Sequence, residues 1–466
     1  TLTQGYSAQG FPEGDFVYPS FSNGYPEGGS PTYYENTSRS MNGYFNLGYS
    51  FDDRYLMDFS LRENGSSVFG ASKRYIGTWS VGLGWNLHKE RFIADHLTWI
   101  DFLKLRASIG NPGNQNFSSS KTLTTFNFQL ASMNYFGMGA VLNQLGNPDL
   151  DWQITLDKNI GIDMTLIDKR LNITADYYHK VTDPLLINIS MPLSSGTSSY
   201  LTNMGKQISQ GLTLSASYYI IQKLDQRFSW LVRGNLRTQK TKLDKIGNKL
   251  DELNKSGQGH NTVRYYNGAD PDDIWAVKSA GIDPSTGREL FYDKEGNYTY
   301  DFSYDNEVIC GNTRPKIEGV IGTSLNYKGF SVSMNFRYQT GASVFNEALF
   351  NKVENISVSG LNKNQDKRAL YERWQNPGDK VRFKDIANAA STPMSSRFIQ
   401  KENVLSMESV YVGYEFYEGW IKKIGLSNLK IQASMRDVFR ASTIKSERGT
   451  LYPFARSLEL GLSFNF

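Results

Sequence analysis

The chain has 466 residues, a formal net charge of +4 and a single cysteine, Cys310. The small charge and the lack of a long basic run argue against a nucleic-acid partner. No stretch of about 18 apolar residues occurs, so no transmembrane helix is expected. Aromatic residues make up 14% and there are 42 glycines, a combination that favours strands and turns over helices.

In chain order, residues 1–40 are rich in Gly, Pro and Ser and predict a loop. Beyond them, apolar and polar residues alternate repeatedly, as in the segment 330–338 and the terminal segment 456–466. A period of two indicates strands with two unlike faces. We predict thirteen strands, beginning near residues 41, 54, 77, 101, 152, 171, 206, 227, 314, 330, 405, 429 and 455.

The connections between these strands alternate in length. The short ones are Phe51–Arg54, Ile167–Arg170, Lys223–Arg227 and Lys328–Gly329, and the long ones cover roughly 111–150, 243–313 and 343–404. Short periplasmic turns and long extracellular loops are typical of a transmembrane antiparallel β-barrel in an outer membrane. A soluble sandwich or β-helix also has alternating strands, but charges on the polar face and aromatic residues near strand ends favour the barrel.

An odd number of strands has a consequence for closure, because bacterial single-chain barrels have an even number. We therefore expect residues 41–466 to be the C-terminal part of a barrel, with 1–40 as an extracellular loop. The remaining strands would come from a preceding segment.

A family resemblance is carried by Leu61–Ile93, which resembles the SusC/RagA-type TonB-dependent transporters of the bacterial outer membrane. The matching residues are Arg62, Gly65, Ser66, Ser67, Phe69, Gly70, Ser80, Gly84, Trp85, Glu90 and Phe92. Further similar segments are Leu103–Phe117, Leu145–Leu186, Ala280–Asn297, Arg373–Asp379 and Ser395–Phe416. The chain departs from the family pattern at Gln153, where Glu is usual, and after Asp437.

The resemblance implies a barrel of about 22 strands with a plugged lumen, of which this chain would supply about the last thirteen. It implies import of oligosaccharides or peptides, a SusD-like lipoprotein that lids the barrel, and TonB, which would act on the missing plug. An assembly of two transporter–lid pairs is a further expectation. A passive porin, a secretion-linked barrel and a soluble β-rich glycan-binding adhesin remain alternatives.

Aromatic and amide side chains gather in the expected loops, where rings stack on sugars or peptide planes and amides bind hydroxyl or backbone groups. The alternative for each is packing within a folded loop. The predicted substrate-binding residues are Tyr33, Tyr34, Asn36, Gln115, Asn116, Arg264, Tyr265, Tyr266, Asn267 and Trp275.

Signals for a metal or a catalytic site are weak. Two oxygen-rich clusters could hold Ca²⁺, although turn formation explains them equally well: Asp270, Asp272 and Asp273, and Asp293, Glu295 and Asn297. The four histidines, His88, His96, His179 and His260, fit no catalytic motif. We therefore expect no enzyme and no required cofactor.

Overall fold

The computed structural model describes residues 2–7, 32–37, 39–67, 74–114, 122–134, 137–191, 196–197, 199–223, 225–248, 250–356, 360, 362, 364–385, 387–388, 390–416, 419–444 and 456–466. None of the helices among them has the length and apolar content needed to cross a membrane.

One large antiparallel sheet dominates these residues. Thirteen strands follow each other in it, each paired with its sequence neighbour in the run, and the short β7 (Gly113–Asn114) pairs with β10 beside them. All thirteen predicted strands are confirmed. They are β3 (Ser40–Phe51), β4 (Tyr55–Ser66), β5 (Tyr75–Asn86), β6 (Ile100–Gly110), β10 (Gln153–Leu166), β11 (Leu171–Thr182), β14 (Lys206–Lys223), β15 (Phe228–Asp244), β21 (Ile317–Tyr327), β22 (Phe330–Phe345), β23 (Ile399–Phe416), β24 (Asn428–Ser442) and β25 (Leu458–Asn465).

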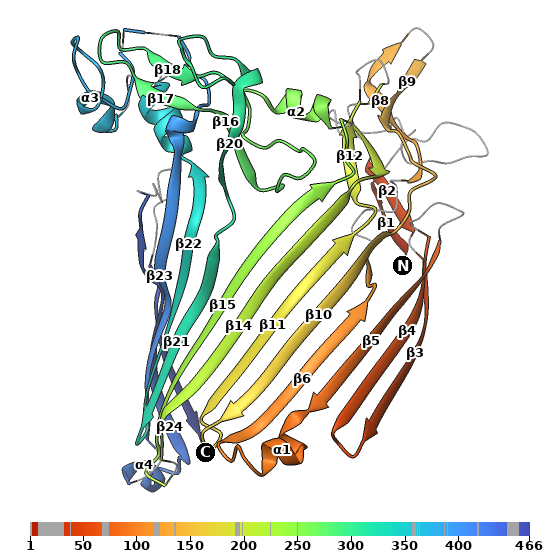
Figure 1. The fold of residues 1–466 in the computed structure, drawn as a ribbon, viewed down its shortest axis with the longest axis vertical. Helices are drawn as coiled ribbons and strands as arrows, with labels where there is room; N and C mark the ends of the chain where they lie inside the picture. The colour runs from red at the N-terminus through yellow and green to blue at the C-terminus, as the bar shows by residue number, and fades with distance from the viewer. Residues whose placement is uncertain are drawn as a thin grey trace.

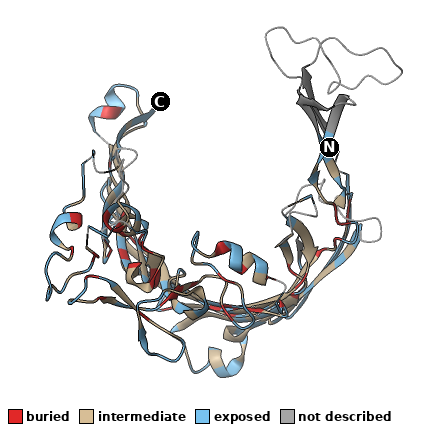
Figure 2. Cartoon of the chain, turned by 90° about the horizontal axis from the view of Figure 1, so that it is seen from above, coloured by how far each residue is buried: buried red, intermediate tan, exposed pale blue. Residues whose placement is uncertain are grey.

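The sheet forms a tilted, curved wall (Figure 1). Seen from above, it bends into an open arc with β3 toward one end and β25 toward the other (Figure 2). Within the described residues these two strands pair on one side only. The wall is therefore part of a cylinder.

The two faces of the wall differ in chemistry, as the alternation predicts. On one face large apolar side chains are exposed across neighbouring strands, such as Leu214 at 37%, Ile321 at 47% and Leu462 at 63%. The cross-strand register keeps them together, because Ile160 lies opposite Tyr177 and Tyr177 opposite Leu212. So much exposed apolar surface suits contact with hydrocarbon.

At one end of the wall, here called the turn end, the connections are short. Lys328 and Gly329 join β21 to β22 with φ angles of 45° and 93°, the left-handed pair that a tight hairpin requires. The four predicted short turns all lie at this end. It also holds the two small helices α1 (Arg91–Ala94) and α4 (Trp420–Lys423) (Figure 1).

A carboxylate organises aromatic side chains at the turn end. Glu90 accepts hydrogen bonds from Trp85 Nε1 at 3.0 Å and from the Tyr55 hydroxyl at 2.9 Å. The two rings stack with centroids 6.2 Å apart. Amphipathic rings of this kind suit a membrane–water boundary.

The opposite end, here called the loop end, carries the long connections. The described residues within 245–316 and 346–398 form what we call the loop cap (Figure 1). Its elements are α2 (Asp251–Gly257), β16 (Asp273–Val277), β17 (Ser279–Ile282), β18 (Glu289–Tyr292), β19 (Tyr298–Thr299), β20 (Glu307–Asn312), η7 (Leu349–Glu354) and α3 (Arg368–Tyr371).

Three further hairpins rise at the loop end. Two lie inside segments predicted as loops: β1 (Leu2–Ser7) with β2 (Thr32–Thr37), and β8 (Thr125–Asn134) with β9 (Gly137–Gln144). The third, β12 (Leu186–Ser190) with β13 (Ser199–Asn203), occupies a long connection that the sequence did not predict, because its strands are only five residues long.

Apolar cores are found in the loops. One cluster in the loop cap contains Leu349, Val353, Ala369, Phe383 and Phe398. A second cluster joins Leu185, Leu243, Ile246 and Leu250 beneath α2. These clusters give the connections that contain them small apolar cores of their own.

Candidate functional site

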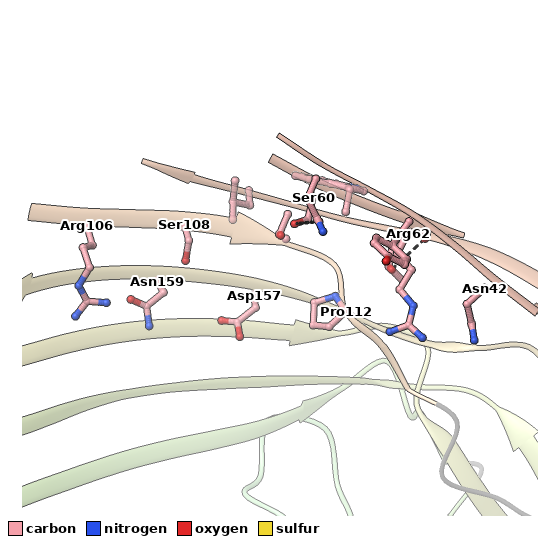
Figure 3. A pocket seen from close by; sticks show the side chains of 15 residues that line it. Asn42, Ser60, Arg62, Arg106, Ser108, Pro112, Asp157 and Asn159 are labelled. Carbon is pink, nitrogen blue, oxygen red and sulfur yellow. Dashed lines mark hydrogen bonds between the residues drawn. The ribbon is translucent and has the colours of Figure 1, made fainter. Parts of the chain in front are cut away.

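The polar face of the wall is hollowed by a cavity of about 890 Å³ on strands β3, β4, β5, β6 and β10. Figure 3 shows Arg62, Arg106, Ser108, Asp157 and Asn159 standing on this face. A curved wall encloses a cavity on its concave side, so the polar face lies on the hollow side of the arc. A polar, charged interior is what a water-filled passage requires.

Arg106 anchors a charge cluster next to this cavity. Its Nε lies 2.6 Å from Asp163 Oδ2 and its Nη2 lies 3.0 Å from Asp176 Oδ1, so it joins β6, β10 and β11. Gly161 lies between these groups, and a Cβ there would be 2.4 Å from the Asp176 carboxylate. Glycine thus leaves room for the ion pair to cross β10.

Similar pairs continue along the polar face. Lys180 lies 2.9 Å from Asp157, and Arg440 lies 2.9 Å from Glu402. Each such pair is partly exposed and adds little to stability. Together they line the interior with hydrogen-bonding groups of both signs.

The loop cap is held together by Arg397, whose side chain is 9% exposed. Its Nη2 lies 2.7 Å from Glu289 and 2.6 Å from Glu354, two carboxylates from different loops. Burial alone would lower the pKa of Arg397, but the two carboxylates outweigh it and raise the pKa above its ordinary value. Two distant segments are therefore fixed to each other.

A second connection between the loops involves Trp374. Its Nε1 donates to the carbonyl of Pro284 at 2.8 Å, and the amide of Gly378 donates to the same carbonyl at 2.7 Å. Gly287 has a φ of +68° and lies against the indole, where a Cβ would come within 2.6 Å of the ring. The loop cap consequently behaves as one folded unit.

The structure gives Arg264 a different place from the predicted one. The side chain is 1% exposed and binds both oxygens of Glu307, at 2.8 and 2.7 Å. It also donates to the carbonyl of Val263 at 2.7 Å. This burial corrects the prediction of direct ligand contact, since Arg264 is enclosed by protein groups.

Tyr265 and Asn267 also make their contacts within the loop cap and its base. Tyr265 packs on the Leu185–Leu250 cluster, and its backbone exchanges hydrogen bonds with the Asn254 amide at 2.8 and 2.9 Å. Asn267 Oδ1 accepts a hydrogen bond from the backbone of Ile246 at 2.9 Å.

Tyr266 and Trp275, both predicted to bind substrate, contact each other with ring centroids 4.8 Å apart and ring planes tilted by 57°. Both line a cavity of about 550 Å³ in the loop cap, here called the Tyr266–Trp275 cavity. Its other lining residues are Asp251, Asn254, Lys255, Gln258, Lys294, Tyr304, Asp305 and Glu307. Burial raises the pKa of Tyr266, so this phenol stays protonated and can donate a hydrogen bond.

The remaining predicted residues cannot be placed in a site. Tyr33, Tyr34 and Asn36 belong to β2, where the structure defines the strand pairing alone. Gln115 and Asn116 lie outside the described residues.

The acidic clusters take part in protein contacts. Asp270 and Asp272 both pair with Arg314, and Asp273 Oδ1 accepts from Asn312 at 2.9 Å. Asp293 accepts from the backbone of Asn297 at 2.7 Å, which closes a turn. Across the described part of the chain, no group of three or more His, Cys, Asp or Glu side chains is arranged to hold a metal ion.

The sequence left two features of the site undetected. The cluster of Arg106 with its two aspartates had a usable signal, because all three charges fall on the polar parity of their strands. The network of Arg397 had none, since its carboxylates lie 108 and 43 residues away in the chain.

A curved antiparallel wall with one apolar and one charged face defines the class of outer-membrane β-barrels. The family model "TonB dependent receptor-like, beta-barrel" matches residues 1–362. The chain therefore belongs to the TonB-dependent receptor β-barrel family, a family of outer-membrane receptors and transporters.

Individual relatives agree with this assignment. The chain is 27% identical to TonB-dependent receptor P39 of Formosa agariphila over 90% of its length, and 26% identical to TonB-dependent receptor SusC of Bacteroides thetaiotaomicron over 92%. In each case 44% of the relative is covered, so the chain spans less than half of their length.

Solved structures share the fold. The RagAB peptide importer in its "open-open" state matches with a TM-score of 0.79 and 21% identity, covering 100% of this chain and 51% of the other. The RagAB peptide transporter matches with a TM-score of 0.78, also at 21% identity, covering 93% of this chain and 47% of the other. The expected resemblance to SusC/RagA-type barrels is confirmed.

Proposed function

We propose that this chain forms the C-terminal part of a TonB-dependent importer that carries oligosaccharides or peptides across the bacterial outer membrane. The observation that carries the proposal is the contrast between the two faces of the wall. Apolar side chains cover one face, and ion pairs and a cavity of about 890 Å³ occupy the other. A large polar solute would cross the membrane through the hydrated interior, along the charged face of the wall.

The open edges of the sheet support a larger barrel. Strands β3 and β25 each have one partner among the described residues, and the matched relatives are more than twice as long as the aligned segment. We propose that strands from the rest of the protein close the barrel, together with a plug that fills its lumen.

TonB would displace that plug, using energy from the inner membrane. A SusD-like lipoprotein would cover the loop end, and two such pairs would form the complete assembly. The loop cap, whose segments are joined through Arg397 and Trp374, suits this arrangement, because pre-organised interfaces change shape little on binding. For signalling across the membrane, the substrate must bind one plug state better than the other.

The Tyr266–Trp275 cavity is the proposed first contact for substrate. Two rings at 4.8 Å offer a stacking surface, and Lys255, Lys294 and Gln258 offer hydrogen bonds. Sugars and peptides both bind such sites. RagAB is named as a peptide importer, whereas the name of SusC gives no substrate. We therefore propose both oligosaccharides and peptides as substrate classes.

The test is uptake by cells that carry the full-length protein. The readout is accumulation of fluorescent oligosaccharides and peptides, measured with and without a protonophore. We expect saturable uptake of one class that the protonophore abolishes. Energy-independent, non-saturable uptake would instead favour a passive porin.

A matched pair of variants tests the cavity. Tyr266→Ala should raise the half-saturation concentration about tenfold, the loss expected for one stacking aromatic. Tyr298→Ala removes a more exposed ring, at 66% against 38%, from the same loop and should leave uptake unchanged. Equal changes of the half-saturation concentration in both variants would contradict substrate binding at this cavity.

A further inference from the structure

A second cavity, of about 790 Å³, lies where the wall meets the loop cap. Strand β15 pairs with β21 only as far as Arg237 opposite Glu318, although β15 continues to Asp244. Beyond that point, loop residues replace β21 as the hydrogen-bonding partner of β15. The backbone N–H of Leu243 donates to the carbonyl of Ala269 at 2.9 Å. The change of partner leaves a hollow between β15, β20 and β22.

Basic side chains dominate this hollow. Five of its lining residues are cationic and two are acidic. The acidic pair is already engaged, because Asp270 binds Arg314 at 3.1 Å and Asp273 binds Asn312 at 2.9 Å. The other four cationic residues are exposed and form no ion pair with any described carboxylate; they are Lys240, Lys242, Lys316 and Lys401.

The position of these lysines relates them to the apolar face. Lys240 and Lys242 share the strand parity of Leu236, and Lys401 shares that of Leu405. Lys316 directly precedes Ile317, an exposed residue at the end of the apolar face. Four residues along a strand tilted at about 45° correspond to a rise of about 10 Å. Leu236 lies opposite Leu214 near the middle of the membrane span, and half of an apolar band about 25 Å tall is about 12 Å. Lys240 and Lys242 therefore stand at the upper boundary of the hydrocarbon, at the level of the headgroups.

We propose that this lysine cluster binds the phosphate groups of a glycolipid in the outer leaflet. Three of these unpaired cations, Lys240, Lys242 and Lys401, follow the lipid-facing parity at headgroup height, where they are positioned for anionic headgroups. Each such cation contributes about fivefold in affinity. The hollow is large enough to seat a phosphorylated sugar. A soluble anionic substrate would enter from the polar face, whereas Lys240, Lys242 and Lys401 follow the opposite parity.

Binding is measured by native mass spectrometry of the full-length protein in detergent, titrated with lipid A that carries two phosphates. The test variant replaces the four lysines with glutamine. A matched control removes four exposed lysines at the turn end: Lys223, Lys328, Lys422 and Lys423. A third variant replaces the four cluster lysines with arginine, which keeps their charge.

We expect the glutamine variant to bind lipid A about 100-fold more weakly, from about fivefold for each of the three lipid-facing lysines. The turn-end control and the arginine variant should bind as the wild type does. Unchanged binding by the glutamine variant would overturn the proposal. So would equal affinity for dephosphorylated lipid A, because apolar contact alone would then explain retention. Inorganic pyrophosphate that competes at the same concentration would assign the cluster to a soluble anion instead. Substrate uptake should persist in the glutamine variant, so failure of the importer proposal would be seen separately.

Discussion

An arginine placed on either face of β14 tests the orientation of the wall. Leu214 lies on the apolar face between Ala175 and Leu236, and its neighbour Ser215 lies on the polar face between Thr174 and Asn235. Leu214 is the ninth of the eighteen residues of β14. At about 3.4 Å per residue and a tilt of about 45°, it is about 20 Å from either strand end, which is the bilayer midplane.

The expected cost follows from this depth. Leu214→Arg should destabilise the folded barrel by about 2–4 kcal/mol, a change of about 30- to 1000-fold in the folding equilibrium. Ser215→Arg should change it by less than about 1 kcal/mol, because its side chain enters the hydrated interior. Ile208→Arg, near the loop end of the same face, should cost about 0–1 kcal/mol, since the penalty falls toward the interface.

The assay is unfolding of the full-length protein in lipid vesicles by guanidinium, followed by tryptophan fluorescence. The shift in midpoint multiplied by the m-value gives the change in free energy. Equal costs at Leu214 and Ser215, or a larger cost at Ser215, would refute the assignment of the faces. A free-energy cost at Ile208 as large as that at Leu214 would refute the placement of Leu214 at the bilayer midplane.

Three further predictions concern the loop cap and the wall. Arg397→Met leaves two buried carboxylates without their cation and should weaken the loop cap by about 3–5 kcal/mol, seen as faster hydrogen exchange there. The Tyr300 hydroxyl, 2.5 Å from Asp283, and then the neighbouring Ser285 and Thr286 lower the pKa of this carboxyl, so its stabilising effect is present above the ordinary value of 3.8 and is lost as the pH falls below it. Hydrogen exchange of the 283–288 turn, corrected for intrinsic rates, should rise in that range. Gly319→Ala places a Cβ 1.9 Å from the carbonyl of Asn235 and should cost about 1–3 kcal/mol in guanidinium unfolding.

Each of these has its own control. Exchange in the barrel strands should stay unchanged in Arg397→Met, and faster exchange throughout the sheet would contradict a local role. Asp283→Asn should remove the pH dependence of the turn, and persistence of that dependence would implicate other groups. Gly43→Ala, where no atom lies within 4 Å of the added Cβ, should be close to neutral. Equal costs at Gly319 and Gly43 would contradict the steric argument.

The wall could be predicted from sequence because its signal is long and repetitive. Alternation persists over strands of 8 to 18 residues, and each strand pairs with its sequence neighbour. Errors occurred where that signal weakens. Strand β23 begins at Ile399, six residues before the predicted start, because the segment from Ile399 to Asn403 is largely polar and its pairing contains bulges.

The loop cap was predictable only in part. The contact between Tyr266 and Trp275 was open to sequence reasoning, because the two lie nine residues apart in one aromatic segment. Arg264 was assigned to a ligand because its partner, Glu307, is 43 residues away. The segments Ala280–Asn297, Arg373–Asp379 and Ser395–Phe416 were each noted separately, yet their convergence through Arg397 and Trp374 depends on tertiary packing.

The connection between β15 and β21 contains 72 residues (245–316), whereas that between β10 and β11 contains four (167–170). Chain-closure entropy grows only with the logarithm of length, so the longer excursion costs about 2.5 kcal/mol more. The small apolar cluster at its base, which includes Leu243, Ile246 and Leu250, can offset that amount. Evolution can therefore lengthen, shorten or exchange such excursions while the strands beneath keep their register, and a transplanted cap should give a new specificity to an unaltered wall.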